Sequence, residues 1–513
     1  MKARLLYADR DFDFDAELPF CHEDVVRDLE VTTVLEAMAA GDRYLFDLVE
    51  RVVFTSLDDR VAIHYRQEIL SDALAHPEMI REMYAIAVGA LDDQRSIWGI
   101  SSHSPGSVLS VAIHQLEAFV ARLGELANFA SKHQRKVEAP GLKVLFASLI
   151  RDLDGRYFDE VRSHLEQLRF RNGLLMSAEL GPDNRGINLI LRSPGDRSAS
   201  WRRRLGIRPH SSYSFTIDQR DEAGADALQD LTNRGINLVA NAAAQSADHI
   251  ASFFKMLRAE LGFYVGCLNL ADRLRAKGAS TCFPEPSESH PVQLSALDLR
   301  DASLVLMSGD EVVGNDVSSD GRPLLIITGA NSGGKSTFLR SVGLAQLMMG
   351  CGMFVCAREF RSSVCGNIFT HFPREEDSSM VSGRLDQELG RMSVIVDQIA
   401  PGDLALFNES FASTNESEGS EIARQVVLAL ADSDVRVIFV THLFDFADSL
   451  RSQSLRAALF LRAQRHPDGR RSYRIEEGDP LSTSFGEDIY LRVGAWLGEA
   501  ASGSRASEPR NSD

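Results

Sequence analysis

The chain has 513 residues, enough for about two to four domains, and its 44% hydrophobic and 25% charged residues are typical of a soluble globular protein. A net charge of −18 argues against a surface that grips nucleic acid as a whole, and it confines any DNA contact to a local basic segment. Six cysteines without zinc-site spacing, no apolar leader and no run of about 18 apolar residues predict a cytoplasmic protein without a membrane partner.

The first half of the chain is predicted to be mainly helical. Apolar residues recur at helical spacing in the ranges 31–91, 108–126 and 144–168, and again from Asp248 to Lys277. Between them, short strands bounded by turn residues are predicted at Gly173–Met176, Gly186–Leu191 and Tyr213–Ile217. After the break at Phe283–Pro286, strands and helices alternate as in an α/β domain with a largely parallel sheet.

The most specific motif is a glycine-rich loop. Gly329–Ser336 matches G-x-x-x-x-G-K-[ST] at every fixed position, after the apolar run Leu324–Ile327 and before a predicted helix. Backbone N–H groups of such a loop surround phosphate oxygens, Lys335 would neutralise the β- and γ-phosphates, and the Ser336 hydroxyl would ligate Mg²⁺. The sequence therefore predicts a site for ATP and Mg²⁺. The predicted nucleotide-binding residues are Gly329, Ala330, Asn331, Ser332, Gly333, Gly334, Lys335, Ser336, Thr337 and Asn315.

Two later strands end in polar residues. Leu404–Phe407 is followed by Asn408 and Glu409, which are predicted to serve the metal, with Glu409 as general base. Because Asn408 carries no charge, Mg²⁺ should be held less firmly and hydrolysis should be slow. His442 follows the strand Val437–Val440 and is predicted to sense the γ-phosphate or orient the water. The alternatives are a solvated strand-end acid at Glu409 and a structural histidine at His442.

These segments resemble the MutS family of DNA mismatch-repair ATPases. Thr328–Thr337 resembles the family's TGPNxGGKST loop, Gly352–Ala357 its GxFVPA segment with Cys356 in place of proline, and Thr441–His442 its FxTH strand end. Asn408–Gly419 aligns with the DExGxGTxxxDG element. Glu409, Thr414 and Gly419 match that element, whereas Asn408, Phe411, Ser413 and Glu418 depart from it.

The resemblance also assigns roles outside these motifs. Gly314–Val317 resembles a loop near the nucleotide base, which implies that Asn315 contacts the nucleotide. Ser382 and Gly383 lie where the family has a signature loop, so with Thr414 they are expected to sense the ATP of a partner subunit. Residues 1–30 are too few for the family's mismatch-reading domain. The resemblance therefore implies ATPase activity and DNA handling, but not mismatch reading by that mechanism.

The fold class implied is multidomain α+β. It combines an all-α core and lever helices carrying a small β-rich insertion with an α/β P-loop ATPase domain of the ABC type, paired as a homodimer through the ATPase domains. The predicted segments are 1–30 as an N-terminal segment, 31–115 as helical core, 116–280 as lever helices with a clamp-like insertion at about 172–218, 281–498 as ATPase domain, and 499–513 as a disordered tail.

The insertion carries a cluster of basic residues. Arg197, Arg202, Arg203, Arg204 and Arg208 are predicted to hold DNA phosphates without reading sequence. A solvated basic loop is the alternative. Three functions remain open: a clamp on duplex or branched DNA in repair or recombination, an ATP-gated switch with little hydrolysis, and a MutS-like protein that engages protein partners such as repair proteins.

Overall fold

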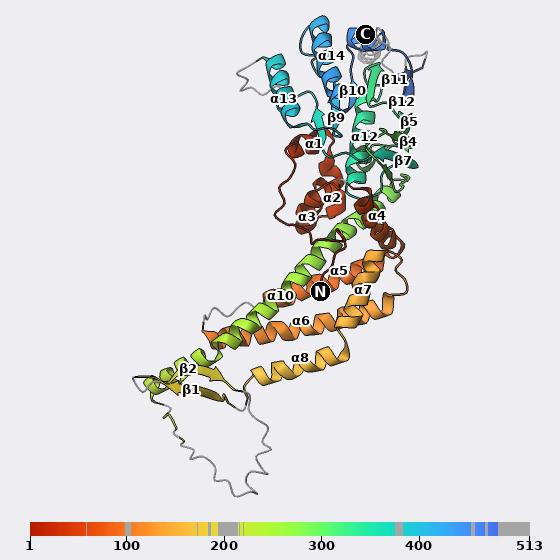
Figure 1. Cartoon of the computed structure of the whole chain (residues 1–513). Coiled ribbons are helices and arrows are strands. Elements are labelled where there is room, and N and C mark those ends of the chain that lie inside the picture. Colours follow the sequence, from red (N-terminus) through yellow and green to blue (C-terminus); the bar gives the residue numbers. More distant parts are fainter. Residues whose placement is uncertain are drawn as a thin grey trace, which may run out of the picture. The chain divides into compact units, whose positions relative to one another are not determined.

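The computed structural model describes residues 1–57, 59–97, 104–171, 173–182, 186–192, 214, 216–218, 220–374, 383–452, 457–466 and 470–480 (Figure 1). The chain divides into two compact units. Unit 1 comprises residues 1–4, 78–138 and 142–261, and unit 2 comprises residues 5–77, 139–141 and 262 onward. Among the described residues, no helix combines the length and the apolar character that a membrane crossing needs.

The helices are α1 (His22–Asp28), α2 (Val31–Ala39), α3 (Arg43–Phe54), α4 (Arg60–Ala75), α5 (Pro77–Ile97), α6 (Pro105–His133), α7 (Pro140–Asp152), α8 (Gly155–Leu168), α10 (Glu222–Ala276), α11 (Ala302–Met307), α12 (Lys335–Gly350), α13 (Arg384–Gln398), α14 (Glu416–Asp432) and α15 (Phe444–Ser452). The strands are β1 (Met176–Leu180), β2 (Gly186–Leu191), β3 (Glu285–Ser287), β4 (Leu294–Leu299), β5 (Asn315–Ser318), β6 (Leu324–Gly329), β7 (Glu359–Ser363), β8 (Ile368–His371), β9 (Leu404–Asn408), β10 (Arg436–Val440), β11 (Ala458–Arg465) and β12 (Arg471–Glu477).

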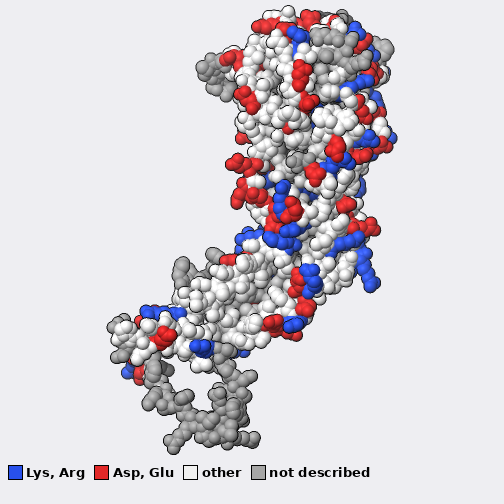
Figure 2. Space-filling view, viewed as in Figure 1, with Lys and Arg blue, Asp and Glu red and all other residues white. Residues whose placement is uncertain are grey.

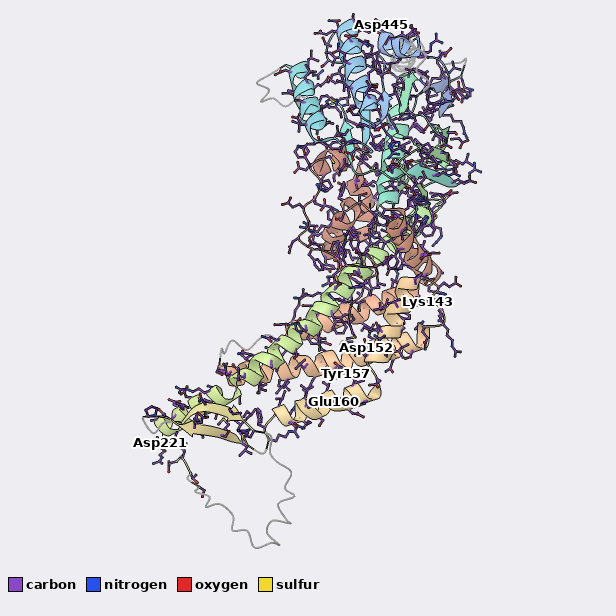
Figure 3. All side chains as sticks on the ribbon, in the orientation of Figure 1. Lys143, Asp152, Tyr157, Glu160, Asp221 and Asp445 are labelled. Atoms are coloured by element: carbon purple, nitrogen blue, oxygen red, sulfur yellow. The ribbon has the colours of Figure 1, made fainter. Side chains whose placement is uncertain are left out.

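Unit 1 is a group of helices with a small antiparallel sheet. Phe119 of α6 stacks on Phe254 of α10, with ring centroids 5.8 Å apart, and this pair lies in the apolar contact between the two helices. Helix α8 begins at Asp154, whose carboxylate accepts the Tyr157 N–H at 2.8 Å as an N-cap. Figure 3 labels Tyr157 on this helix. Strands β1 and β2 pair from Met176–Leu191 to Leu180–Gly186.

Two sheets organise unit 2. The larger has the strand order β12-β11-β6-β10-β9-β8, in which only β12 runs antiparallel to its neighbour. Its central strands β6 and β10 are buried along their whole length, as expected for parallel strands covered on both faces. The smaller sheet has the order β3-β7-β4-β5. Together these elements confirm the predicted α/β domain.

A buried arginine anchors helix α4 within unit 2. Arg66 on α4 donates to the carbonyl oxygens of Leu6 at 3.0 Å and Cys351 at 3.1 Å, and its guanidinium lies 4.9 Å from the ring centroid of Tyr7. Burying a guanidinium is costly unless it is hydrogen-bonded. Arg66 therefore fixes α4 to the N-terminal segment and to the end of α12, the helix that follows the glycine-rich loop.

Three predicted elements differ from the structure. The strand predicted at Gly173–Met176 is instead β1 at Met176–Leu180, so the prediction is wrong for residues 173–175. Helix α10 begins at Glu222, well before the predicted Asp248, because the Ala-rich sequence of residues 222–247 has high helix propensity without a marked apolar face. Ser214, Thr216 and Ile217 are not in a strand, so the predicted strand at Tyr213–Ile217 is wrong for those residues. Tyr213 and Phe215 themselves lie outside the described residues.

Candidate active site at the carboxyl ends of the parallel strands

The glycine-rich loop, hereafter the phosphate loop (Gly329–Ser336), joins β6 to α12. Gly329 and Gly334 have φ angles of 107° and 93°, which side-chain-bearing residues rarely adopt. A Cβ atom on Gly333 would lie 2.7 Å from the Ala463 Cβ and 2.8 Å from the Ala330 carbonyl oxygen. The loop thus lies directly against β11, and glycine is required at these positions.

Lys335 lies inside the phosphate loop. It is only 4% exposed, and its ammonium group donates to the carbonyl oxygens of Gly329 at 2.9 Å and Ala330 at 3.1 Å. Burial lowers the pKa of Lys335, and the negative charge of Glu409 partly opposes this shift. A phosphate group that entered the loop would supply the negative charge that this buried cation lacks.

The strand ends bring the predicted metal residues together. Val440 of β10 pairs with Ile327 of β6 on one side and with Asn408 of β9 on the other, so the three strands end at one edge. There the Ser336 hydroxyl donates to the Asn408 side-chain oxygen at 2.8 Å. These two oxygen atoms are of the kind that Mg²⁺ prefers, directly or through water. The residues present therefore fit a magnesium ion, although the usual carboxylate is replaced by the amide of Asn408.

Glu409 and His442 face each other at the same edge. The Glu409 N–H donates to the Val440 carbonyl oxygen at 2.8 Å, and the residue has a left-handed φ of 51°. Its carboxylate lies 3.9 Å from the His442 Nδ1, and the side chains of Glu409 and His442 are 34% and 40% exposed, respectively. Both groups are therefore accessible beside the phosphate loop, as a general base and its neighbour would need to be.

Strand β12 contributes residues that no sequence motif indicated. The Asn315 amide donates to the Tyr473 carbonyl oxygen at 3.2 Å and accepts the Ile475 N–H at 2.7 Å, so it joins β5 to β12. Tyr473 has a φ of 58°, is 51% exposed, and its Cα lies 3.4 Å from the Cβ position of Gly334. Arg471 donates to the Asn331 carbonyl oxygen at 3.2 Å. The sequence of Arg471–Ile475 carries no nucleotide-site motif. The pairing of β12 with β11 places this segment against the phosphate loop.

Comparison with known proteins agrees with this geometry. The model of the MutS2 N-terminal domain matches residues 58–277, and the model of MutS domain V matches residues 325–493. The chain belongs to the MutS family. It is 27% identical over 222 residues to an endonuclease MutS2 of Lactobacillus helveticus, which is 42% of this chain and 28% of that protein. It is 36% identical over 135 residues to a DNA mismatch repair protein MutS of Chloroflexus aurantiacus, which is 25% of this chain and 14% of that protein.

A further relative is the MutS protein homolog 4 of Mus musculus, 26% identical over 245 residues, or 46% of this chain and 24% of that protein. In all three cases the aligned part is less than a third of the relative's length. The matches therefore establish the family, and the activity of this chain is argued from its own residues.

Of the residues predicted to sense a partner's nucleotide in this MutS-family chain, Gly383 and Thr414 belong to the part that the structure describes. Ser382 and the five predicted DNA-binding arginines, Arg197, Arg202, Arg203, Arg204 and Arg208, lie outside the described residues. Gly383 is the N-cap residue of α13. The Thr414 hydroxyl donates to the Glu418 carboxylate at 2.5 Å at the start of α14. Thr337 follows Ser336 in the first turn of α12.

A cavity of about 230 Å³ opens beside Glu409. Its lining combines side chains of α13 with the segment after Glu409: Pro373, Arg374, Arg384, Gln387, Glu388, Arg391, Glu409, Ala412 and Ser413. No sequence pattern indicated this cavity, since its residues come from three separate segments.

Proposed function

We propose that this chain is an ATPase that binds ATP with Mg²⁺ at the phosphate loop and couples hydrolysis to a conformational change. The observation that carries the proposal is the convergence of Lys335, Ser336, Asn408 and Glu409 at the carboxyl ends of adjacent parallel strands. Ligands of open α/β sheets bind at this edge. The match to MutS domain V supports the same function.

The buried positive charge of Lys335 favours the binding of a phosphate group. Its ammonium group is buried against two carbonyl oxygens, and burial lowers its pKa, so its charged form is poorly compensated. Phosphate oxygens would take the place of these carbonyl oxygens and restore a strong charge-assisted contact. The N-terminus of α12 adds the favourable field of its dipole.

Ser336 and Asn408 are the residues that would hold Mg²⁺, and Glu409 would accept a proton from the attacking water. When bound, the metal would neutralise negative charge on the phosphates. His442, with its Nδ1 3.9 Å from the Glu409 carboxylate, would orient that water. Because Asn408 is neutral, we expect weaker metal binding than a carboxylate would give, and therefore slow turnover.

We also propose that Tyr473 receives the adenine base. Its backbone is fixed by Asn315, it lies against Gly334, and the residue is about half exposed. An exposed ring beside a phosphate site provides a stacking surface for a base. Asn315 would then act on the nucleotide indirectly, by placing Tyr473.

At the level of the whole protein, we propose a homodimer paired through the ATPase domains, with Ser382, Gly383 and Thr414 facing the partner's nucleotide. Relatives are named as DNA mismatch repair proteins and endonucleases, which supports a role in DNA repair or recombination. Figure 2 shows acidic and basic side chains interspersed over the visible face. DNA contact is proposed for the Arg197–Arg208 segment, within a clamp-like insertion at about 172–218 of the lever region (116–280), because five arginines are clustered there in the sequence.

Nucleotide binding tests the site. Lys335→Ala should lower ATP affinity by about 100-fold, since it removes a buried charge-assisted contact. The control is Lys277→Ala, because Lys277 is exposed and donates to the Ser308 carbonyl oxygen rather than to the phosphate loop. Isothermal titration that gave equal affinities for Lys335→Ala and the wild type would refute the phosphate-loop assignment.

Salt-dependent DNA binding tests the clamp. Charge reversal at Arg202, Arg203 and Arg204 should abolish binding to duplex and branched DNA and flatten its salt dependence, because phosphate contacts release counterions. Unchanged binding would refute DNA contact by this segment.

The neutral Asn408 favours a second candidate function, an ATP-gated switch that hydrolyses little and acts through protein partners. The measured rate of ATP turnover distinguishes the ATPase from the ATP-gated switch. Tight ATP binding with no phosphate release, with or without DNA, would support the switch over the ATPase.

A further inference from the structure

The backbone after β9 holds a strained turn, hereafter the Glu409 turn (Glu409–Phe411). Glu409 has a φ of 51° and Phe411 a φ of 64°, and neither is glycine. Each left-handed residue costs about 1–2 kcal/mol. Such a conformation persists only where its surroundings fix it. The contacts that fix the turn therefore also fix the direction of the Glu409 side chain.

His371, at the end of β8, holds the middle of the turn. It is 1% exposed, its Nδ1 lies 2.7 Å from the Ser410 hydroxyl oxygen, and its Nε2 lies 3.2 Å from the Glu388 carbonyl oxygen. A carbonyl oxygen can only accept, so Nε2 carries a proton. In the neutral ring Nδ1 is then an acceptor for the Ser410 hydroxyl, which also lies 3.0 Å from the His371 carbonyl oxygen as a second acceptor. This assignment needs a neutral imidazole, and burial lowers the pKa of His371 to about 4.

Glu388, on α13, holds the end of the turn. Its carboxylate accepts the Phe411 N–H at 2.9 Å, while its carbonyl oxygen accepts from His371. The Phe411 ring also stacks on the imidazole, with centroids 5.7 Å apart and an interplanar angle of 27°. Glu388 of α13 thus supports the Glu409 turn in two ways. Its side chain contacts the turn directly, and its carbonyl oxygen holds His371, which contacts the turn in its middle.

We propose that His371 and Glu388 are positioning residues for Glu409, and that through them the rate of hydrolysis depends on the placement of α13. This inference rests on the proposed ATPase function. Helix α13 begins directly after Gly383, the described residue of the segment proposed to face the partner's nucleotide. A shift of α13 pulls on the Phe411 N–H and on His371 together, and so turns the Glu409 carboxylate without moving the phosphate loop, which lies on another strand.

The test distinguishes an effect on ATP turnover from an effect on ATP binding in the 513-residue chain. Glu388→Ala and Ser410→Ala should each lower kcat for ATP by about 10- to 100-fold, the cost of a small misplacement. The dissociation constant for ATP should stay within about twofold of the wild type, since Lys335 and its loop are untouched. Glu388→Gln keeps an oxygen acceptor for the Phe411 N–H and should recover most of the lost kcat.

The matched control is Glu421→Ala, because Glu421 is an exposed residue of α14 that pairs with Arg424. It should leave kcat and ATP affinity unchanged. The inference is overturned if wild-type protein hydrolyses ATP and both Glu388→Ala and Ser410→Ala keep their kcat. It is also overturned if kcat, ATP affinity and melting temperature fall together, which would indicate a purely structural role. If Glu409→Gln turns over as fast as the wild type, the proposed function fails, and this inference with it.

Discussion

Acid should destabilise the folded chain through His371. Burial, and then the positive charge of Arg391, lowers the pKa of this imidazole from 6.5 to about 4. In the unfolded chain the ring takes up a proton below about pH 6.5, whereas in the folded chain it stays neutral down to about pH 4. The unfolded state therefore binds more protons in this window, and stability falls as the pH falls through it.

The size of the effect follows from the shift. At about 1.4 kcal/mol per pKa unit, lowering the pKa from 6.5 to about 4 removes about 3 kcal/mol over the whole window. Most of this, about 2 kcal/mol, is lost between pH 7 and pH 5. Above pH 7 the effect vanishes, since the imidazole is neutral in both states.

Urea unfolding followed by circular dichroism, at several pH values between 7 and 5, measures this loss. His371→Gln has no titrating ring at this position, so the wild type should lose about 2 kcal/mol more than the variant over this range. The other histidines contribute equally to both proteins and cancel in the difference. Parallel stability curves would refute the neutral, buried state of His371.

Three further predictions concern the nucleotide site. Asn408→Asp adds a negative charge where the metal is proposed to bind, so a Mg²⁺ titration of the ATPase rate should half-saturate at a concentration about 10-fold lower; an unchanged value would show that Asn408 does not serve the metal. Gly333→Ala crowds β11 and should lose about 1–3 kcal/mol of stability in thermal unfolding. Gly155→Ala, whose Cβ position meets nothing within 4 Å, should lose none, and equal losses would contradict the close packing of the loop on β11. Tyr473→Ala should weaken ATP binding by about 10-fold while leaving tripolyphosphate binding unchanged, in a calorimetric comparison of the two ligands; equal losses for both would exclude a base-stacking role.

The parts of the site that could be predicted from the sequence are those set by the local chain. An apolar run before Gly329 specifies a buried strand, and the spacing from Gly329 to Ser336 specifies the loop and the helix that follows. Glu409 is found in the same way, because it closely follows a buried strand. In parallel sheets such strand ends meet at one edge, so their proximity could be expected without knowing the strand order.

The missed parts depend on pairing between distant segments. Tyr473 reaches the phosphate loop only because β12 returns antiparallel to β11, and nothing in the sequence around it specifies that register. His371 and Glu388 meet the Glu409 turn only because β8 pairs with β9 and α13 packs against β8. The early start of α10 cannot be predicted from periodicity for another reason. Its first half is Ala-rich, so its helix propensity is high, but it has few large apolar side chains to mark a packed face.

The most direct test of the central claim is a single-turnover assay of ATP hydrolysis with Mg²⁺, comparing the wild type with Glu409→Gln. We predict slow phosphate release by the wild type, a further loss of about 100-fold or more in the variant, and ATP binding of similar affinity in both. Equal rates of phosphate release from the two proteins would contradict the assignment of Glu409 as the general base and, with it, the active site at the ends of β6, β9 and β10.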